Sequence, residues 1–353
     1  MSAPVAPAVP ILPDDAARAL LVGRLWDPAT AGPRVVAVQE GEVFDLTGLA
    51  ATVSELLELP GLAAAVRAAL TEPRWSTTDV VTASLAQELD RPHFLAPVDL
   101  QVIKACGVTF VDSMIERVIE ERCGGDASRA LEMRELVGSA LGGSIASIRP
   151  GSAEAAEAKK VLMAEGLWSQ YLEVGIGPDP EVFTKAPVLS SVGLGAGIGI
   201  PSFSSWNNPE PELVLIATSK GAVVGATLGN DVNLRDVEGE DGYALEGRNS
   251  VARISRPFEE LVAATFGDHH QYPDGFALFT GTLFAPTQDR EVPGQGFTHR
   301  LGDLVTIRSS HLGALVNRVG AAEELPQWSY GLRALFGYLH DQRNVQEPAV
   351  SAN

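Results

Sequence analysis

Lysine is scarce in this chain, and positive charge is in short supply overall. The 353 residues hold 26 Lys and Arg against 45 Asp and Glu, which gives a formal net charge of -19. Only five of these cations are lysines, and none of them follows Lys220. Proteins that bind nucleic acid displace counterions from phosphates with clustered Lys and Arg side chains. The charge balance therefore argues against a nucleic-acid partner.

Cysteine and long apolar runs are also missing. The two cysteines, Cys106 and Cys123, are too few for a disulfide framework and lack the Cys/His spacing of a zinc site, so we expect them to fill the core. No uninterrupted apolar run is long enough to cross a bilayer. The N-terminal stretch has no basic residue before Arg18, unlike a secretory signal. These absences predict a cytoplasmic protein with no membrane partner.

The composition that is present, 45% hydrophobic and 20% charged, is typical of a globular protein. The length favours about two domains. A Pro- and Ala-rich start predicts a flexible tail over residues 1–13, followed by a small α+β domain over 14–95 that ends in a linker at 92–98. The remainder, 96–345, is predicted to form a larger domain, with a second tail over 346–353.

Hydrophobic periodicity predicts the elements of both domains. In the small domain, short strand-like runs (19–25, 34–39 and 41–46) precede helical stretches (53–59 and 62–70). Apolar residues at helical spacing predict an amphipathic helix over 111–122, and Ser152 is the expected N-cap of another helix that runs to about Trp168. After residue 180, strand patterns between turns, including a hairpin at 219–222, predict a mainly β domain.

Two carboxylates lie two residues apart in a predicted strand. Glu210 and Glu212 should share one face of that strand, and the hairpin that follows can bring Asp231 back beside them. Like charges this close are unfavourable unless a cation lies between them or one is protonated. Three carboxylates without His or Cys form a hard ligand set suited to Mg²⁺ or Mn²⁺. The alternative is a solvated strand face in an acidic protein.

Several longer motifs resemble the fumarylacetoacetate hydrolase superfamily, in that family's order. They cover most of the chain after residue 95, and the most specific is E-x-E followed by G-N-D-V-x-x-R-D. The motifs are GVTFVDSMIE (107–116), EVFTKAPVLSS (181–191), WNNPEPELVLI (206–216), GATLGNDVNLRD (225–236), LFTGTLFAP (278–286) and THRLGDLVTIRSSHLGALVNRV (298–319). The resemblance implies an α+β, mainly β catalytic domain of the mixed β-sandwich or β-roll type. It also implies that Glu210, Glu212 and Asp231 hold Mg²⁺, or Mn²⁺ in its place.

Several stretches, among them APVDLQVIKACGVTF (96–110) and HHQYPDGFALF (269–279), resemble the branch of this family that dehydrates 2-keto-3-deoxy pentonates such as the D-xylonate and D-arabinonate derivatives. Hydrolase members carry a His base in the first motif, where this chain has Ser113. A serine without a partner base does not activate water as His does. The implied reaction removes a proton from C3 and hydroxide from C4, which yields 2,5-dioxopentanoate, with the metal as a Lewis acid.

The same resemblance implies roles for further residues. Glu116 is the candidate for proton transfer, with Ser113 on the same helix face and Lys185 orienting the substrate carboxylate or stabilising an enolate. Substrate-binding roles fall to a further set: Thr109, Phe110, Thr282 and Arg235. Each of these residues has a plain alternative, as a solvated charge, a surface lysine, a strand threonine or a structural ion pair. A homodimer or homotetramer is also expected.

Two other functions stay open at this stage. A C–C bond hydrolase or decarboxylase of acylpyruvate-like acids is one, although Ser113 counts against it. An inactive metal- or ligand-binding paralogue is the other, and it is supported by a missing lysine. In the dehydratases a lysine follows the D-V-x-x-R-D motif, but here the chain passes directly into a stretch that resembles a much later part of those proteins.

Several tens of residues therefore have no counterpart at about Glu240 and Asp241. Either a segment is left out of the printed sequence or the gene carries a true deletion. We favour the first explanation, because deletion of a core strand usually exceeds the marginal stability of a domain.

Overall fold

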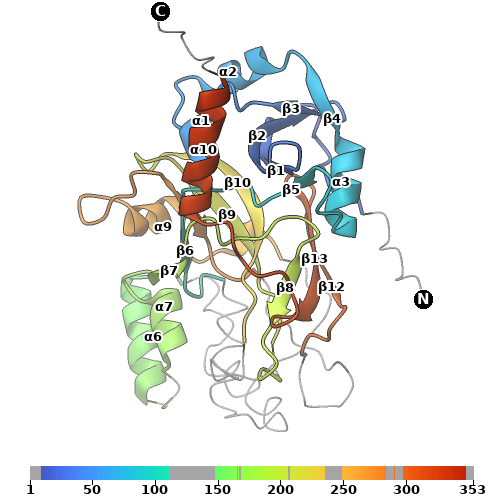
Figure 1. The fold of residues 1–353 in the computed structure, drawn as a ribbon. Coiled ribbons are helices and arrows are strands. Elements are labelled where there is room, and N and C mark those ends of the chain that lie inside the picture. Colours follow the sequence, from blue (N-terminus) through green and yellow to red (C-terminus); the bar gives the residue numbers. More distant parts are fainter. Residues whose placement is uncertain are drawn as a thin grey trace, which may run out of the picture.

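A computed structural model describes residues 9–110, 148–164, 166, 168–205, 207–234, 249–283, 290 and 297–346. Within these ranges the chain forms three sheets with helices packed around them (Figure 1). The prediction of an α+β, mainly β fold is confirmed. None of the helices in these ranges combines the length and the apolar character that crossing a bilayer requires.

The N-terminal part forms a five-stranded sheet in the order β4-β3-β2-β1-β5. The β2–β3 hairpin turns at Glu40 and Gly41, whose φ angles of 51° and 84° are the positive values that a tight two-residue hairpin turn requires. The strands and helices predicted here are confirmed, and a third helix is added. The elements are β1 (Leu21–Asp27), β2 (Gly32–Gln39), β3 (Glu42–Asp45), α1 (Val53–Leu57), α2 (Leu62–Ala69), β4 (Pro73–Ser76), α3 (Thr77–Ala86) and β5 (His93–Phe94).

Two predicted boundaries need correction. The start of the predicted linker is strand β5, which pairs with β1 through Trp26 and Leu25. Of the predicted tail, residues 9–13 pack on the larger domain: the Ala314 amide donates to the Ile11 carbonyl at 2.9 Å, and Val9 and Ile11 pack against a buried cluster that contains Val316. Burial of apolar side chains that the Pro-rich pattern concealed explains why this stretch is ordered.

The larger domain holds the other two sheets. A five-stranded sheet has the order β10-β9-β11-β6-β7, and a three-stranded sheet has the order β12-β13-β8. Within the first, only β11 and β6 run parallel, while β13 and β8 are parallel in the second. The strands are β6 (Val102–Cys106), β7 (Val182–Ala186), β8 (Gly197–Ile200), β9 (Pro211–Ala217), β10 (Val223–Asn230), β11 (Phe276–Phe279), β12 (Leu304–Ser309) and β13 (Gly313–Ala321).

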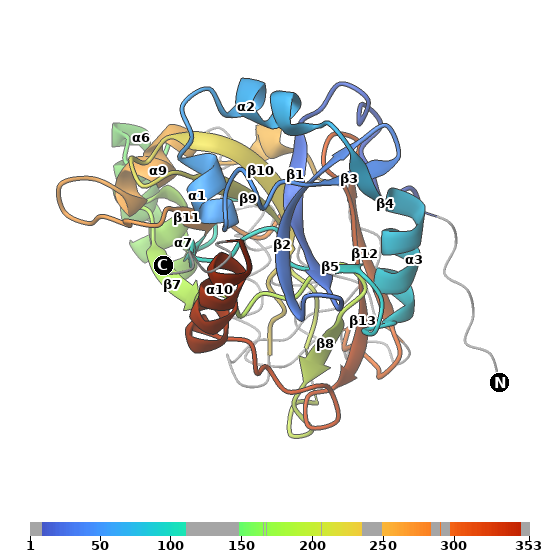
Figure 2. The ribbon, with the colours of Figure 1, turned by 45° about the horizontal axis from the view of Figure 1, so that its top comes forward.

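Helices lie around the five-stranded sheet of the larger domain, which contains β9, and extend beyond it (Figure 2). The helix predicted from Ser152 exists, with the Ser152 hydroxyl accepting from the Ala155 amide at 3.2 Å, but it ends at Ala164. The predicted helix over 111–122 lies outside the described residues. The helices of this domain are α6 (Ala153–Ala164), α7 (Gln170–Ile176), the 3-10 helix η3 (Val251–Arg253), α9 (Phe258–Thr265) and α10 (Leu332–Gln346).

Strand β9 lies at the centre of the core and is buried along both faces. Val214 and Ile216 pack against Val35 and Leu56 of the N-terminal part, while Leu213 and Leu215 belong to a cluster that includes Leu261 of α9. Burial on both faces accounts for a nearly continuous apolar run where a half-exposed strand would alternate. The two predicted domains therefore share one core.

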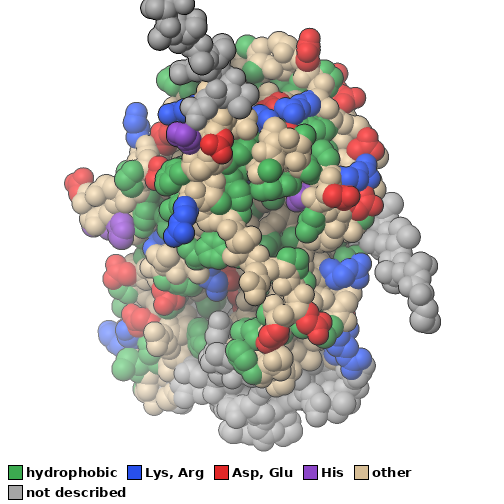
Figure 3. Space-filling view, viewed as in Figure 1, with side chains coloured by type: hydrophobic (Ala, Val, Ile, Leu, Met, Phe, Trp, Pro, Cys, Tyr) green, Lys and Arg blue, Asp and Glu red, His purple; other side chains and the backbone are tan. Residues whose placement is uncertain are grey.

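Charged side chains of both signs are spread over the described part of the surface seen in Figure 3, without a large patch of one sign. Among the described residues of that face, acidic and basic side chains are interspersed with apolar ones, and Lys and Arg form no stripe.

Candidate metal centre

Strand alternation and one hairpin bring the three predicted carboxylates together. Glu210 immediately precedes β9 and Glu212 lies within it, so both side chains leave the same face. Strand β10 returns antiparallel with Gly229 opposite Glu212, and the Asp231 amide then donates to the Glu210 carbonyl at 2.9 Å. One oxygen from each carboxylate lies within 4.8 Å of the others. The predicted ligand set is thus assembled in space.

The three carboxylates are taken out of water. Glu210, Glu212 and Asp231 are 8%, 2% and 8% exposed. Burial, and then the charges of Asp231 and Glu210, raise the pKa of Glu212 well above its ordinary value. A site of this kind either keeps a proton or takes up a cation. Oxygen-only donors suit a hard divalent ion, so the residues fit Mg²⁺.

Amide side chains hold Glu210 in place. The Asn233 side-chain amide donates to Glu210 Oε1 at 3.0 Å, and the Asn230 side-chain oxygen accepts from the Glu210 backbone amide at 3.1 Å. Both asparagines belong to the G-N-D-V-N stretch that already attracted attention. Their contacts with Glu210 could not be assigned from the sequence, because those contacts depend on the hairpin register.

Lys185 supplies a local positive charge. Its Nζ lies 2.7 Å from Asp231 Oδ1, and its side chain is 32% exposed. The lysine comes from β7, at the opposite edge of the sheet from β10. A partly exposed ammonium beside a buried carboxylate can also reach an anionic ligand that enters from solvent.

Glu212 is held by a backbone amide from a distant part of the chain. The Gly281 amide donates to Glu212 Oε2 at 2.8 Å. Gly281 has a φ of 99°, and a Cβ atom there would lie 2.2 Å from Thr109 Oγ1. The Thr109 hydroxyl in turn donates to the Thr280 carbonyl, so it fixes the peptide that presents this amide. Sequence reasoning missed Gly281, although the T-G-T motif contains it.

The remaining predicted residues lie at different places. Thr282 follows Gly281 directly in the chain. Thr109 and Phe110 are only 3% and 1% exposed, which favours a role in positioning, and their predicted contact with substrate stays a prediction. Ser113, Glu116 and Arg235 lie outside the described residues.

Comparisons with known proteins were made at the level of sequence and of structure. No family model matches the chain. A 2-dehydro-3-deoxy-D-arabinonate dehydratase of Saccharolobus solfataricus is 28% identical over 182 residues, which is 40% of this chain and 58% of that protein. A probable 2-keto-3-deoxyxylonate dehydratase of Haloferax volcanii is 30% identical over 191 residues, which is 42% of this chain and 63% of that protein. The matches span about three-fifths of these relatives.

Among solved structures, the fold is shared with 2-keto-3-deoxy-D-arabinonate dehydratase. The complex of that protein with magnesium and 2,5-dioxopentanoate has a TM-score of 0.56 and 18% identity, over 85% of this chain and 98% of that chain. Its apo form has a TM-score of 0.55 and 17% identity over the same shares. The resemblance stated from the motifs is confirmed in sequence similarity and in fold.

Both sequence alignments are longer than the part of this chain that they contain. Forty per cent of 353 residues is about 141, against 182 matched positions for the Saccharolobus protein. Forty-two per cent is about 148, against 191 positions for the Haloferax protein. Each relative therefore has about forty residues inside the matched stretch that face no residue of this chain.

Proposed function

We propose that this protein is a Mg²⁺-dependent dehydratase, a lyase, that converts a 2-keto-3-deoxy-D-pentonate into 2,5-dioxopentanoate in pentose catabolism. The observation that carries the proposal is the cluster of three buried carboxylates, with oxygens within 4.8 Å of one another, beside Lys185. The dehydratase names of both sequence relatives, and a shared fold with a magnesium and 2,5-dioxopentanoate complex, support it. We expect it to act in the cytoplasm as a homodimer or homotetramer.

Glu210, Glu212 and Asp231 would hold the metal ion. When bound, Mg²⁺ supplies a Lewis acid that polarises the 2-keto group and acidifies the hydrogens on C3. The chain's own residues keep this ligand set in order: Asn233 fixes Glu210, and the Gly281 amide fixes Glu212. Because these hydrogen bonds exist in the protein itself, the carboxylates need little rearrangement to accept a cation.

Lys185 is the group suited to the substrate carboxylate. Its ammonium is partly exposed and lies 2.7 Å from Asp231, so an acid bound at the carboxylate cluster would meet it. The protein carries a net charge of -19, which repels an anionic acid at long range. Capture of the substrate therefore depends on local groups of this kind.

The reaction removes one water molecule. A proton leaves C3 and hydroxide leaves C4, which forms a C3–C4 double bond, and proton shifts then place the aldehyde at C5. Glu116 remains the predicted group for proton transfer, with Ser113 beside it on the predicted helix. Thr282 is close enough to Gly281 in sequence to line the same site.

A coupled assay tests the proposal. Purified protein with Mg²⁺ and 2-keto-3-deoxy-D-xylonate should form a semialdehyde that an NAD(P)-linked dehydrogenase oxidises, and EDTA should abolish the signal. An absence of product, unchanged by EDTA or added Mg²⁺, would refute it. Formation of a shorter keto acid or of CO₂ would point instead to hydrolysis or decarboxylation.

A further inference from the structure

A cavity lies on the side of β9 that faces away from the carboxylates. Its volume is about 830 Å³. Pro209, Pro211 and Leu213 line it, and they alternate along the chain with Glu210 and Glu212. Alternate residues of a strand point to opposite faces. The cavity is therefore separate from the candidate metal centre.

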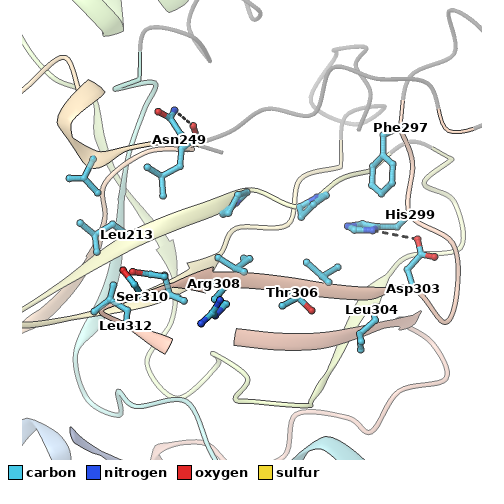
Figure 4. Close-up of a pocket in the computed structure, with 18 of the residues that line it drawn as sticks. Leu213, Asn249, Phe297, His299, Asp303, Leu304, Thr306, Arg308, Ser310 and Leu312 are labelled. Carbon is cyan, nitrogen blue, oxygen red and sulfur yellow. Dashed lines mark hydrogen bonds and ion pairs between the residues drawn. The ribbon is translucent and has the colours of Figure 1, made fainter. Parts of the chain in front are cut away.

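One wall of the cavity is the edge of a strand. All six residues of β12, Leu304–Ser309, line it (Figure 4). Residues from both faces of a strand can border one cavity only where that cavity follows the strand's edge. In the part of the chain that the structure describes, β12 pairs with β13 alone, at its other edge. Backbone groups of an unpaired edge are a template for another strand.

The wall opposite this edge is apolar. It is built from Leu213 of β9, Leu228 of β10, and Leu283, together with Pro209 and Pro211. A six-residue strand is about 20 Å long. An extended segment laid against β12 would thus place every second side chain against these leucines and prolines.

A buried histidine closes one end of the cavity (Figure 4). The His299 side chain is 1% exposed, and within the described residues neither ring nitrogen makes a hydrogen bond. Its Nδ1 lies 3.9 Å from Asp303 Oδ2, while Arg290 Nη2 donates to Asp303 Oδ1 at 2.7 Å. A buried polar group normally has a partner. The ring can offer one donor or one acceptor to a molecule in the cavity.

We propose that this cavity is a strand-accepting site, in which an extended apolar peptide adds to the free edge of β12. The occupant is an extended stretch taken from the roughly forty residues that each sequence relative has inside the matched region without a counterpart in this chain. The sequence motifs predict that the missing residues belong at about Glu240 and Asp241. Leu228 precedes that point and Asn249 follows it, and both line the cavity, which agrees with this choice of occupant. In the 353-residue chain, this site takes such a strand in trans.

Peptide binding tests the site on the full 353-residue protein. The unmatched stretch of the Saccharolobus solfataricus relative is divided into overlapping fluorescein-labelled peptides of about twelve residues, and binding is followed by fluorescence anisotropy. At least one peptide should bind with a micromolar Kd. Leu228→Glu should weaken that binding at least tenfold, whereas Leu89→Glu, a matched change at an exposed leucine of the N-terminal part, should leave it unchanged.

Amide hydrogen exchange then distinguishes strand addition from simple filling of the cavity. Bound peptide should slow exchange in the 304–309 segment. No binding at 1 mM peptide, equal binding to Leu228→Glu, or unchanged exchange in β12 would each overturn the proposal. Circular dichroism of the variants establishes that they are folded. If Leu228→Glu is not folded, a second variant, His299→Leu, takes its place in the test.

Discussion

Lys185 Nζ lies 2.7 Å from Asp231 Oδ1, so a metal ion bound at the proposed centre would compete with the lysine for that carboxylate. The pair joins β7 to the end of β10, the two edge strands of one sheet. It makes the lysine the natural probe of the site, because its removal should change metal binding and substrate handling in opposite directions.

The Lys185→Gln variant should bind Mg²⁺ more tightly and turn over more slowly. Loss of a nearby cation at a partly exposed site is worth about 0.5 to 1 kcal/mol, or roughly a twofold to fivefold gain in metal affinity. Turnover should fall by about a hundredfold or more if the ammonium orients the substrate. Calorimetric titration with Mg²⁺ and the coupled assay measure the two effects, with Lys185→Arg as the control. A fall in both would mean that the lysine supports the fold of the site.

Glu212→Gln should separate stability from metal binding. The pKa of Glu212 is raised in the folded state, so its contribution to stability is present below its ordinary pKa and is lost as pH rises through the raised value. A glutamine keeps an oxygen that can accept from the Gly281 amide, and because it does not ionise it removes the loss of stability at higher pH. In EDTA the variant should be more stable than the parent by about 1 to 3 kcal/mol, increasingly so at higher pH.

The same variant should lose the increase in Tm that Mg²⁺ gives the parent protein. Thermal melts from pH 5 to pH 8, with EDTA or with Mg²⁺, provide both readings. Glu259→Gln, at an exposed glutamate in the first turn of α9, is the matched control and should resemble the parent throughout. A variant that still responds to Mg²⁺ would remove Glu212 from the ligand set.

His299 should make the protein sensitive to acid. Burial is the main cause that lowers its pKa to about 4. A histidine with a lowered pKa contributes stability above its ordinary pKa, and that stability is lost as pH falls from about 6.5 toward 4. The free energy of unfolding from urea titrations should fall by up to about 3 kcal/mol across this range. His299→Leu should flatten the decline, whereas a change at the exposed His311 should not.

Gly281→Ala should destabilise the protein by about 2 to 3 kcal/mol and weaken Mg²⁺ binding. The added Cβ combines a positive φ with a 2.2 Å approach to Thr109 Oγ1. The double variant Thr109→Ala/Gly281→Ala should recover part of the loss, since the colliding oxygen is gone. Recovery is incomplete because the Gly107 carbonyl lies 2.9 Å from the same point. Strictly additive effects on stability would show that the two residues are not coupled.

Intact mass decides whether the residues that have no counterpart near Glu240 are left out of the printed sequence or deleted from the gene. Protein from the native source should be heavier than 37.2 kDa, by about forty residues, if a segment is left out of the printed sequence. A mass equal to 37.2 kDa would establish a true deletion and contradict the explanation that we favour.

The clustering of the three carboxylates could be predicted from the sequence because their geometry is local. A period of two places Glu210 and Glu212 on one face, and the turn at 219–222 determines the register that returns Asp231. Gly281 could not be predicted in this way, since its bond to Glu212 joins residues 69 positions apart. The packing of Ile11 on Ala314 was concealed for the same reason.

The hairpin of β9 and β10 carries the whole proposed ligand set on one uninterrupted stretch, from Glu210 to Asp231. A metal centre built in this way is inherited as a single block of sequence. Gains or losses of chain downstream of Asp231 leave the block whole. Cation binding can therefore persist through rearrangements that alter the surrounding walls, and with them the range of molecules that the protein accepts.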